Sequence, residues 1–333
     1  MKKKRTLALC MVVLLVVLMA SGCKKQVGTP EDNAVSEADK KTDENEEVVV
    51  HKYGFSGIDM ENPYYITLVK SLRESITEEG STLITEDPQG DSQKQVEQIQ
   101  GMIKEGIELL FLSPVDWQKI TPALKELKEA NVKIVNVDTQ VKNMEYIDAY
   151  IGADNKNAGF VCGEDLTKRY PKGGKIVILE CPTMNSINDR ITGFEEAIAE
   201  KGFEVVRRED THGDMQESMV DAEKIFTENT DIVAVMCGND PTALGALVAA
   251  KEQKDFQAVI YGVDGSPDIK QELKKPNSAV VGTGAQAPIE IGKRAAKIGL
   301  QILNGETYEK ETYVETFLIT GENVDMYGVD GWQ

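Results

Sequence analysis

The sequence has little histidine and none of the common motifs of nucleophilic, phosphate-binding or zinc-dependent chemistry. Only two histidines occur, His51 and His212, and they are far apart in the chain. The patterns GxSxG, GxxxxGK[ST] and HExxH are absent, although the corresponding chemistries depend on such arrangements. We therefore expect no catalytic residues, no metal site and no cofactor.

Cysteine is also scarce, and its spacing fits neither a metal site nor a disulfide framework. Three of the five cysteines lie beyond Cys23, and an odd number without metal-binding spacing argues against both. Cys181 and Cys237 follow predicted strands and could be neighbours, which leaves their pairing open. We expect free buried thiols at these positions.

Basic residues are outnumbered by acidic ones, 37 Lys and Arg against 56 Asp and Glu, which gives a net charge of −19. Removal of residues 1–22 would take away four basic residues and leave 33 against 56, a net charge of −23. A surface of this sign repels a phosphate backbone. We expect no nucleic-acid partner.

Residues 1–22 have the pattern of a lipoprotein signal peptide. A basic start, MKKKR, is followed by the apolar run 7–20, which is shorter than the roughly 20 residues that cross a bilayer. Ala20-Ser21-Gly22 then precedes Cys23 and resembles a bacterial lipobox, whereas Cys10 follows the bulky Leu9. We expect Cys23 to become the lipidated N-terminus. The alternative is an ordinary secretory signal beside an incidental cysteine.

Residues 23–47 hold the lipidated cysteine and then a polar segment without aromatic residues. Such a segment cannot bury enough apolar surface to offset its ordering entropy. We expect a disordered tether that reaches roughly 25–30 Å.

From residue 48 onward, short apolar runs alternate with segments of helical period, which predicts α/β lobes with parallel sheets. A predicted helix over 286–304 and a predicted strand over 312–319 return after the second series of βα units. We expect two Rossmann-like lobes joined by a hinge of three crossings, near 152–155, 285–288 and 316–319. The N-terminal lobe would comprise 48–152 and 287–317, and the C-terminal lobe 153–286 and 318–333.

Three predicted strands end in carboxylate or amide residues. VKIVNV (132–137) precedes Asp138, DIVAVMC (231–237) precedes Gly238-Asn239, and AVIYGV (258–263) precedes Asp264. The carboxyl ends of parallel strands border the ligand crevice of an open α/β sheet. These residue types predict a polar small molecule held by hydrogen bonds.

Several segments together resemble the ribose/galactose type of periplasmic sugar-binding protein. They are GFSGIDMENPYY (54–65), NVDT (136–139), IGADN (151–155), NDRITGF (188–194), CGNDPTALGA (237–246), YGVDGSPD (261–268) and GTGAQ (282–286). The resemblance spans nearly all of residues 48–320. It implies two lobes that close around one sugar and deliver it to an ABC permease. A monomeric, extracytoplasmic, membrane-anchored lipoprotein is the expected form.

The resemblance also implies which side chains bind the ligand. These are Asn62, Tyr64, Tyr65, Asp138, Thr139, Arg190, Asn239, Asp264 and Gln286, with Ser56, His212 and Trp117 as further candidates. Carboxylates accept hydrogen bonds from sugar hydroxyls, amide and guanidinium groups donate to them, and an aromatic face covers the ring C–H surface.

Two departures from the ribose pattern leave the sugar open. Thr139 stands where the pattern has Arg, and the segment Asp210-Thr211-His212-Gly213 lacks the usual aromatic residue, for which His212 is a candidate replacement. A non-sugar polyol or a nucleoside is an alternative ligand.

Other functions also stay open at this point. Asn62 serves equally well as a helix cap. Asp138 and Asp264 could form a glycosidase pair, but a nearby Arg would keep both ionised, whereas an acid catalyst needs a raised pKa. A subunit that presents its ligand to a membrane kinase or chemoreceptor would share these features.

Overall fold

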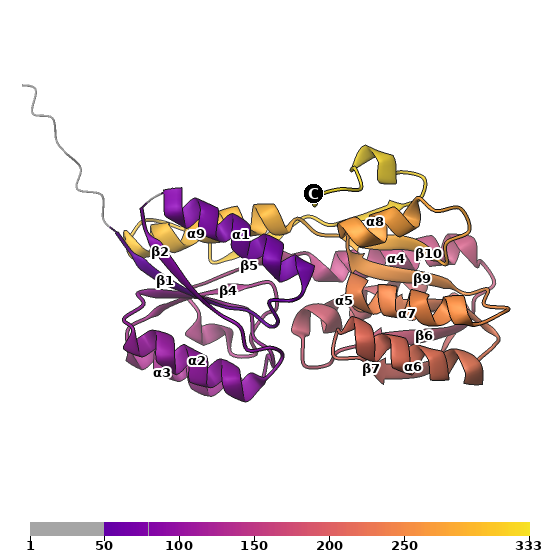
Figure 1. Cartoon of the computed structure of the whole chain (residues 1–333), viewed down its shortest axis with the longest axis horizontal. Helices are drawn as coiled ribbons and strands as arrows, with labels where there is room; N and C mark the ends of the chain where they lie inside the picture. The colour runs from indigo at the N-terminus through magenta and orange to yellow at the C-terminus, as the bar shows by residue number, and fades with distance from the viewer. Residues whose placement is uncertain (1–49, 79) are drawn as a thin grey trace, which may run out of the picture. The chain divides into compact units, whose positions relative to one another are not determined.

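The computed structural model describes residues 50–78 and 80–333, in which strands and helices alternate along most of the chain (Figure 1). The predicted signal peptide, Cys23 and the tether therefore lie outside the described residues. None of the described helices is long and apolar enough to cross a membrane.

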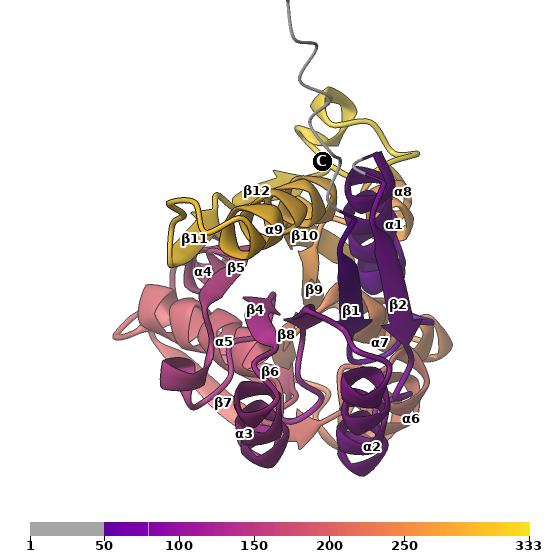
Figure 2. The ribbon, with the colours of Figure 1, turned by 90° about the vertical axis from the view of Figure 1, so that its left-hand side faces the viewer.

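The first sheet has six strands in the order β11-β5-β4-β3-β1-β2, all paired in parallel. Its strands are β1 (Lys52–Ser56), β2 (Thr82–Glu86), β3 (Leu109–Leu112), β4 (Lys133–Val137), β5 (Ala149–Ala153) and β11 (Glu311–Val314). Helices α1 (Pro63–Glu78) and α9 (Pro288–Leu303) cover one face, and α2 (Ser92–Lys104) and α3 (Thr121–Glu129) cover the other (Figure 2). A short 3-10 turn, η1 (Met144–Tyr146), precedes β5.

Alternation of side chains along β3 explains the two apolar layers of this lobe. Leu109 and Phe111 pack in the cluster under α1 and α9, whereas Leu110 and Leu112 pack in the cluster over α2 and α3. Successive residues of a strand point to opposite faces of the sheet. A continuous apolar strand is therefore buried on both sides, as parallel sheets require.

The second sheet has the order β12-β10-β9-β8-β6-β7, and only β12 is antiparallel to its neighbour. Its strands are β6 (Gly174–Glu180), β7 (Phe203–Asp210), β8 (Ile232–Cys237), β9 (Val259–Asp264), β10 (Val280–Ala285) and β12 (Phe317–Thr320). Helices α4 (Asn155–Arg169) and α5 (Asn185–Ile198) pack on one face, and α6 (Met215–Glu228), α7 (Asp240–Glu252) and α8 (Pro267–Leu273) on the other. The 3-10 turn η2 (Val324–Met326) follows β12.

The chain passes between the two sheets three times. Asp154 separates β5 from α4, Gln286 and Ala287 separate β10 from α9, and Glu315 and Thr316 separate β11 from β12. The first and third crossings lie side by side, because the Asp154 amide donates to the Val314 carbonyl at 2.9 Å and the Thr316 hydroxyl donates to the Asp154 carbonyl at 2.9 Å. The predicted fold class, two Rossmann-like lobes with a three-crossing hinge, is confirmed.

The prediction of one strand over residues 312–319 is wrong. The chain forms β11 and β12 instead, each four residues long, and they belong to different sheets. The third crossing therefore falls inside the apolar run. Cys162, Cys181 and Cys237 are buried and free, so the expectation of unpaired thiols is confirmed for these three.

Candidate functional site

Polar side chains follow the carboxyl ends of strands in both sheets. Asp138 and Thr139 come directly after β4, and Asn239 follows β8 after one glycine. Asp264 is the last residue of β9, and Gln286 follows β10. Neighbouring parallel strands end at one edge of a sheet, which brings these side chains together there.

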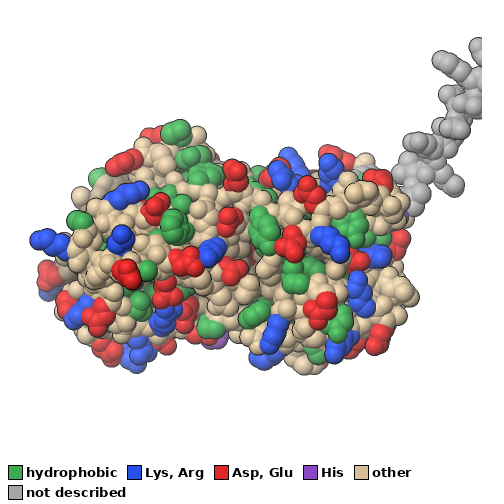
Figure 3. Space-filling model, turned by 180° about the vertical axis from the view of Figure 1, so that it is seen from behind, with side chains coloured by type: hydrophobic (Ala, Val, Ile, Leu, Met, Phe, Trp, Pro, Cys, Tyr) green, Lys and Arg blue, Asp and Glu red, His purple; other side chains and the backbone are tan. Residues whose placement is uncertain are grey.

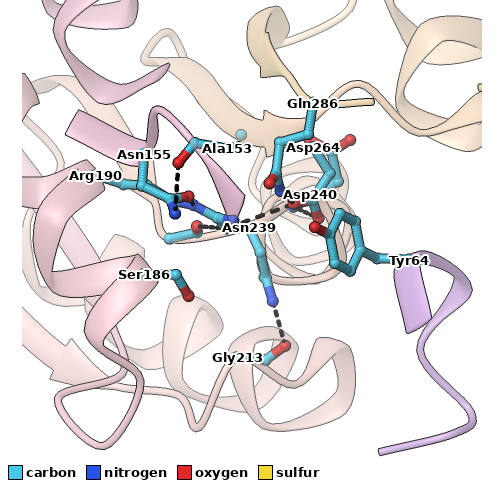
Figure 4. A network of polar contacts seen from close by, with 12 residues as sticks. Tyr64, Ala153, Asn155, Ser186, Arg190, Gly213, Asn239, Asp240, Asp264 and Gln286 are labelled. Carbon is cyan, nitrogen blue, oxygen red and sulfur yellow. Dashed lines mark hydrogen bonds and ion pairs between the residues drawn. The ribbon is translucent and has the colours of Figure 1, made fainter. Parts of the chain in front are cut away.

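Arg190 of α5 lies at the centre of the second lobe's polar cluster. Its Nε donates to Asn155 Oδ1 at 2.8 Å and its Nη1 donates to the Gly238 carbonyl at 2.8 Å. Nη1 also lies 3.4 Å from Asp264 Oδ1, and the two side chains are 4% and 5% exposed (Figure 4). A buried ion pair is tolerated only when further hydrogen bonds satisfy both groups. These bonds hold the guanidinium in one place.

Asp264 joins three elements through its carboxylate. Oδ1 accepts from Gln286 Nε2 at 2.7 Å, and Oδ2 accepts from the Asp240 amide at 3.2 Å. Burial raises the pKa of Asp264, the Arg190 charge opposes this rise, and the Asp240 carboxylate adds to it. The neighbourhood therefore favours a proton on a carboxyl that is ordinarily ionised.

Asp240 lies behind Asp264 and is completely buried. Its carboxylate accepts from the Ser266 amide and from the Thr283 hydroxyl, both at 2.7 Å. Burial raises the pKa of Asp240, and hydrogen bonds from Ser266 and Thr283 oppose the rise. Asp240 thus ties β9, β10 and α8 together beneath the site.

Asp138 organises the first lobe's polar cluster. Its Oδ2 accepts from the Tyr65 hydroxyl at 2.6 Å and from the Thr139 hydroxyl at 3.2 Å. The Tyr65 oxygen also lies 3.0 Å from Ser113 Oγ. Burial raises the pKa of Tyr65 well above its usual value, and the Asp138 charge raises it further. Tyr65 therefore keeps its proton and donates it to Asp138.

Two aspartates of the site have positive backbone φ angles, 65° at Asp138 and 148° at Asp264. An L-residue rarely adopts such values, which cost about 1–3 kcal/mol and persist where the surrounding contacts impose them. Strain of this kind concentrates at ligand sites. Its presence at the two acids that sequence reasoning selected supports their placement in a binding site.

Three buried polar atoms of these residues have no hydrogen-bond partner among the described residues: Asp138 Oδ1, Gln286 Oε1 and the Tyr64 hydroxyl. Figure 4 shows Tyr64 facing the Asp264 and Gln286 side chains from the opposite side of the cluster. A buried group without a partner costs roughly 1–3 kcal/mol. The three atoms come from both lobes and offer two acceptors and one hydroxyl to a ligand.

The two lobes also touch each other beside this cluster. Thr139 Oγ1 lies 2.6 Å from Ser186 Oγ of α5. The Trp117 amide donates to the Thr183 carbonyl at 3.1 Å, and its indole Nε1 donates to the Pro182 carbonyl at 3.3 Å. Trp117 therefore lies in the contact between the lobes, and its ring nitrogen is engaged there.

Three other predicted residues make their side-chain contacts with residues outside the ligand-binding set or with a helix end. The Asn62 side chain accepts from the Tyr64 amide at 2.9 Å and so caps α1. Ser56 Oγ accepts from the buried Gln95 amide at 3.1 Å, inside the first lobe. The His212 side chain is 62% exposed, and its Nδ1 lies 2.6 Å from Glu217 Oε2.

A scan against family models matches residues 53–307 to the periplasmic binding protein domain. This match covers more than half of the chain. The chain belongs to the periplasmic binding protein domain family.

Curated relatives of this family member are similar over most of their length. The ribose import binding protein RbsB of Bacillus subtilis is 28% identical over 259 residues, which are 77% of this chain and 83% of the relative. The protein of the same name from Salmonella typhimurium is 24% identical over 261 residues, which are 78% of this chain and 87% of the relative.

A solved structure of an ABC transporter solute-binding protein from Mycobacterium smegmatis, with bound glycerol, has a TM-score of 0.79 and 26% identity. The structural match covers 85% of this chain and 98% of the Mycobacterium smegmatis chain. A solved structure of a Bacillus halodurans protein with bound myo-inositol has a TM-score of 0.76 and 23% identity. The match covers 83% of this chain and 96% of the Bacillus halodurans chain, and it shows that the two proteins share a fold. These relatives are binding proteins of import or transport systems, and the family to which this chain belongs is one of binding proteins, not of enzymes.

Sequence reasoning missed four residues that complete the cluster. Asn155 follows the first crossing within the IGADN segment, where its position after a strand end was the available signal. The position of Asp240 in the first turn of α7 is typical of a helix-capping residue, but Asp240 is buried and also accepts hydrogen bonds from Ser266 and Thr283. Ser186 and Trp332 carried no local signal, because their contacts come from the other lobe.

Proposed function

We propose that this chain is an extracytoplasmic, lipid-anchored binding protein that captures a neutral monosaccharide between its lobes and delivers it to an ABC permease. The observation that carries the proposal is that buried polar atoms of Asp138, Gln286 and Tyr64 have no hydrogen-bond partner within residues 50–78 and 80–333. A sugar hydroxyl both donates and accepts, so several hydroxyls on one small molecule suit two acceptors and a phenol. The named relatives, which import ribose, support the same class of ligand.

We place the ligand against Tyr64, Tyr65, Asp138, Thr139, Arg190, Asn239, Asp264 and Gln286. The Asn239 amide is held by its bonds to the Gly213 carbonyl at 2.8 Å and to the Thr242 amide at 2.9 Å, which orients it at the end of β8. Tyr64 supplies an aromatic face to ring C–H groups. The lobe boundaries proposed from the sequence, 48–152 with 287–317 and 153–286 with 318–333, place these residues on both sides.

A neutral cyclitol or related polyol is the second candidate ligand. Thr139 brings a hydroxyl where the ribose pattern has a guanidinium, and this hydroxyl already contacts Ser186 at 2.6 Å. The site therefore has one strong donor fewer for a sugar ring. A solved structure with the same fold contains myo-inositol.

Calorimetric titration with D-ribose, D-allose, myo-inositol and the anion ribose 5-phosphate tests the proposal. At least one neutral compound is expected to bind and the anion is not, because like charges in a desolvated site cost several kcal/mol. Asp264→Asn is expected to weaken binding roughly tenfold to a hundredfold, since a hydrogen bond to a charged group contributes about 1.5–3 kcal/mol.

The exposed Asp268, four residues further on in α8, provides the matched control, because Asp268→Asn should leave the affinity unchanged. Tight binding of the anion alone, or unchanged affinity in Asp264→Asn, would place the ligand elsewhere.

A further inference from the structure

The C-terminal tail, residues 321–333, is fastened to the second lobe after β12. Val324 is buried in the core cluster of α6, α7 and α8, and the Tyr327 ring stacks on Phe317 with centroids 4.7 Å apart. Lys274 Nζ lies 2.6 Å from Asp325 Oδ1. The tail then continues past α8 to the C-terminus, which lies near α1 in both ribbon views (Figures 1 and 2).

A buried lysine holds the last residues of the tail. Lys270 of α8 is fully buried, and its ammonium group donates to the Gly331 carbonyl. Burial lowers the pKa of Lys270, whereas Asp240 and Asp330 oppose that change. The Gln333 side-chain amide lies against Gly265, where an added Cβ would come within 2.9 Å of it. The tail end is thus positioned beside Asp264, the neighbour of Gly265.

Trp332 then reaches the first lobe. Its ring centroid lies 6.1 Å from that of Tyr64, with the planes at 74°, an edge-to-face arrangement. Trp332 is half-buried and packs against the first lobe's core cluster, which contains Tyr64. Tyr64 in turn is 4% exposed and has an unpartnered hydroxyl among the site residues.

We propose that the C-terminal tail is a latch in which Trp332, carried by the second lobe, holds Tyr64 of the first lobe and favours the closed arrangement. Opening of the lobes must break the Trp332–Tyr64 contact or detach the tail from Lys270. The latch acts in the absence of ligand, so it does not depend on which solute binds. Trp332 is a positioning residue for Tyr64.

Hydrogen exchange at the Trp117 amide measures closure, because this amide donates to Thr183 of the other lobe. Exchange is followed in the full chain without added ligand. Trp332→Ala is expected to accelerate exchange at Trp117 about two- to tenfold, the range that an aromatic pair of ordinary strength gives. Trp332→Phe keeps an aromatic ring and is expected to restore most of the protection.

Two controls distinguish opening of the lobes from an unspecific change in the tail and from global unfolding. Met326→Ala changes a tail side chain that is 79% exposed and should leave Trp117 exchange unchanged. Amides of β8 report global unfolding and should not accelerate in Trp332→Ala. Unchanged Trp117 exchange in Trp332→Ala, or equal acceleration at Trp117 and β8, would overturn the latch. Since no sugar is present, failure of the sugar titrations leaves this outcome unaffected.

Discussion

Arg190 lies among carboxylates in a part of the protein that water barely reaches. Asp264 is 3.4 Å from its Nη1, and Asp240 donates its amide to Asp264 while its own carboxylate is satisfied by Ser266 and Thr283. The two carboxyls influence each other's ionisation, so they titrate as a pair. One guanidinium cannot fully compensate both negative charges.

Stability should therefore fall as pH rises through the range in which Asp264 ionises. Its pKa is raised from the ordinary 3.8 to about 7 by burial, despite Arg190. The folded protein then binds this proton more tightly than the unfolded chain, so its contribution is full below about pH 4 and is lost as pH rises to about 7. Asp264→Asn removes the titrating group.

Urea unfolding of wild type and Asp264→Asn at several pH values measures this effect. The free energy of unfolding of the wild type, relative to the variant, is expected to decrease between pH 4 and pH 7. Asp268→Asn changes an exposed carboxylate and keeps Asp264, so it should show the same decrease as the wild type. A difference between wild type and Asp264→Asn that is constant with pH would contradict the raised pKa.

At the scale of elements, close approach of α4 and α5 places Arg190. A Cβ on Gly159 of α4 would lie 1.7 Å from the Arg190 carbonyl, and a Cβ on Gly193 of α5 would lie 1.9 Å from the Lys156 carbonyl. Only hydrogen fits at these two positions, so the helix backbones touch. The same approach lets Asn155, in the first turn of α4, accept from Arg190.

Gly159→Ala is expected to wedge the two helices apart. Overpacking of this kind costs about 1–3 kcal/mol, and displacement of α5 moves Arg190 away from Asp264. We expect both a lower melting temperature and weaker ligand binding.

Gly101→Ala in α2 is the matched control, since no atom lies within 4 Å of its added Cβ. Alanine there should stabilise by up to about 1 kcal/mol through helix propensity. Equal effects of the two substitutions would refute the role of the α4–α5 contact.

At the scale of the whole molecule, the excess of acidic over basic residues disfavours electrostatic attraction to an anionic membrane. Figure 3 shows Lys and Arg interspersed with Asp and Glu on the face it presents, and apolar side chains scattered between them. The chain without residues 1–22 has 33 basic and 56 acidic residues. Anionic lipids attract clustered basic residues, so we propose that membrane attachment depends on a lipid at Cys23.

Radiolabelled palmitate tests this attachment in growing cells. The wild type and Cys10→Ala are expected to incorporate label, and Cys23→Ala is not, because the small residues Ala20-Ser21-Gly22 precede Cys23 alone. Cys10→Ala controls for a substitution within the same N-terminal segment. Label in Cys23→Ala, or its absence from the wild type, would show that the protein is processed in another way.

Much of the site was predictable because parallel strands align their ends. Asp138, Asn239, Asp264 and Gln286 each follow or end an apolar run in the sequence, and the sheet geometry alone brings such positions to one edge. Helix α9, predicted over 286–304 and found at Pro288–Leu303, followed from its helical periodicity. These features depend on local sequence.

The amino-acid sequence by itself determined the α/β class, the alternation of buried strands and helices, and the residues at the strand ends, because each depends on side-chain periodicity or a local turn. Tertiary structure alone decided that the run 312–319 divides between two sheets, that Asp240 is a buried partner of Asp264, and that Trp332 meets Tyr64. These outcomes depend on contacts between segments far apart in the chain, and such contacts stabilise the protein only after the chain has folded back to bring the segments together.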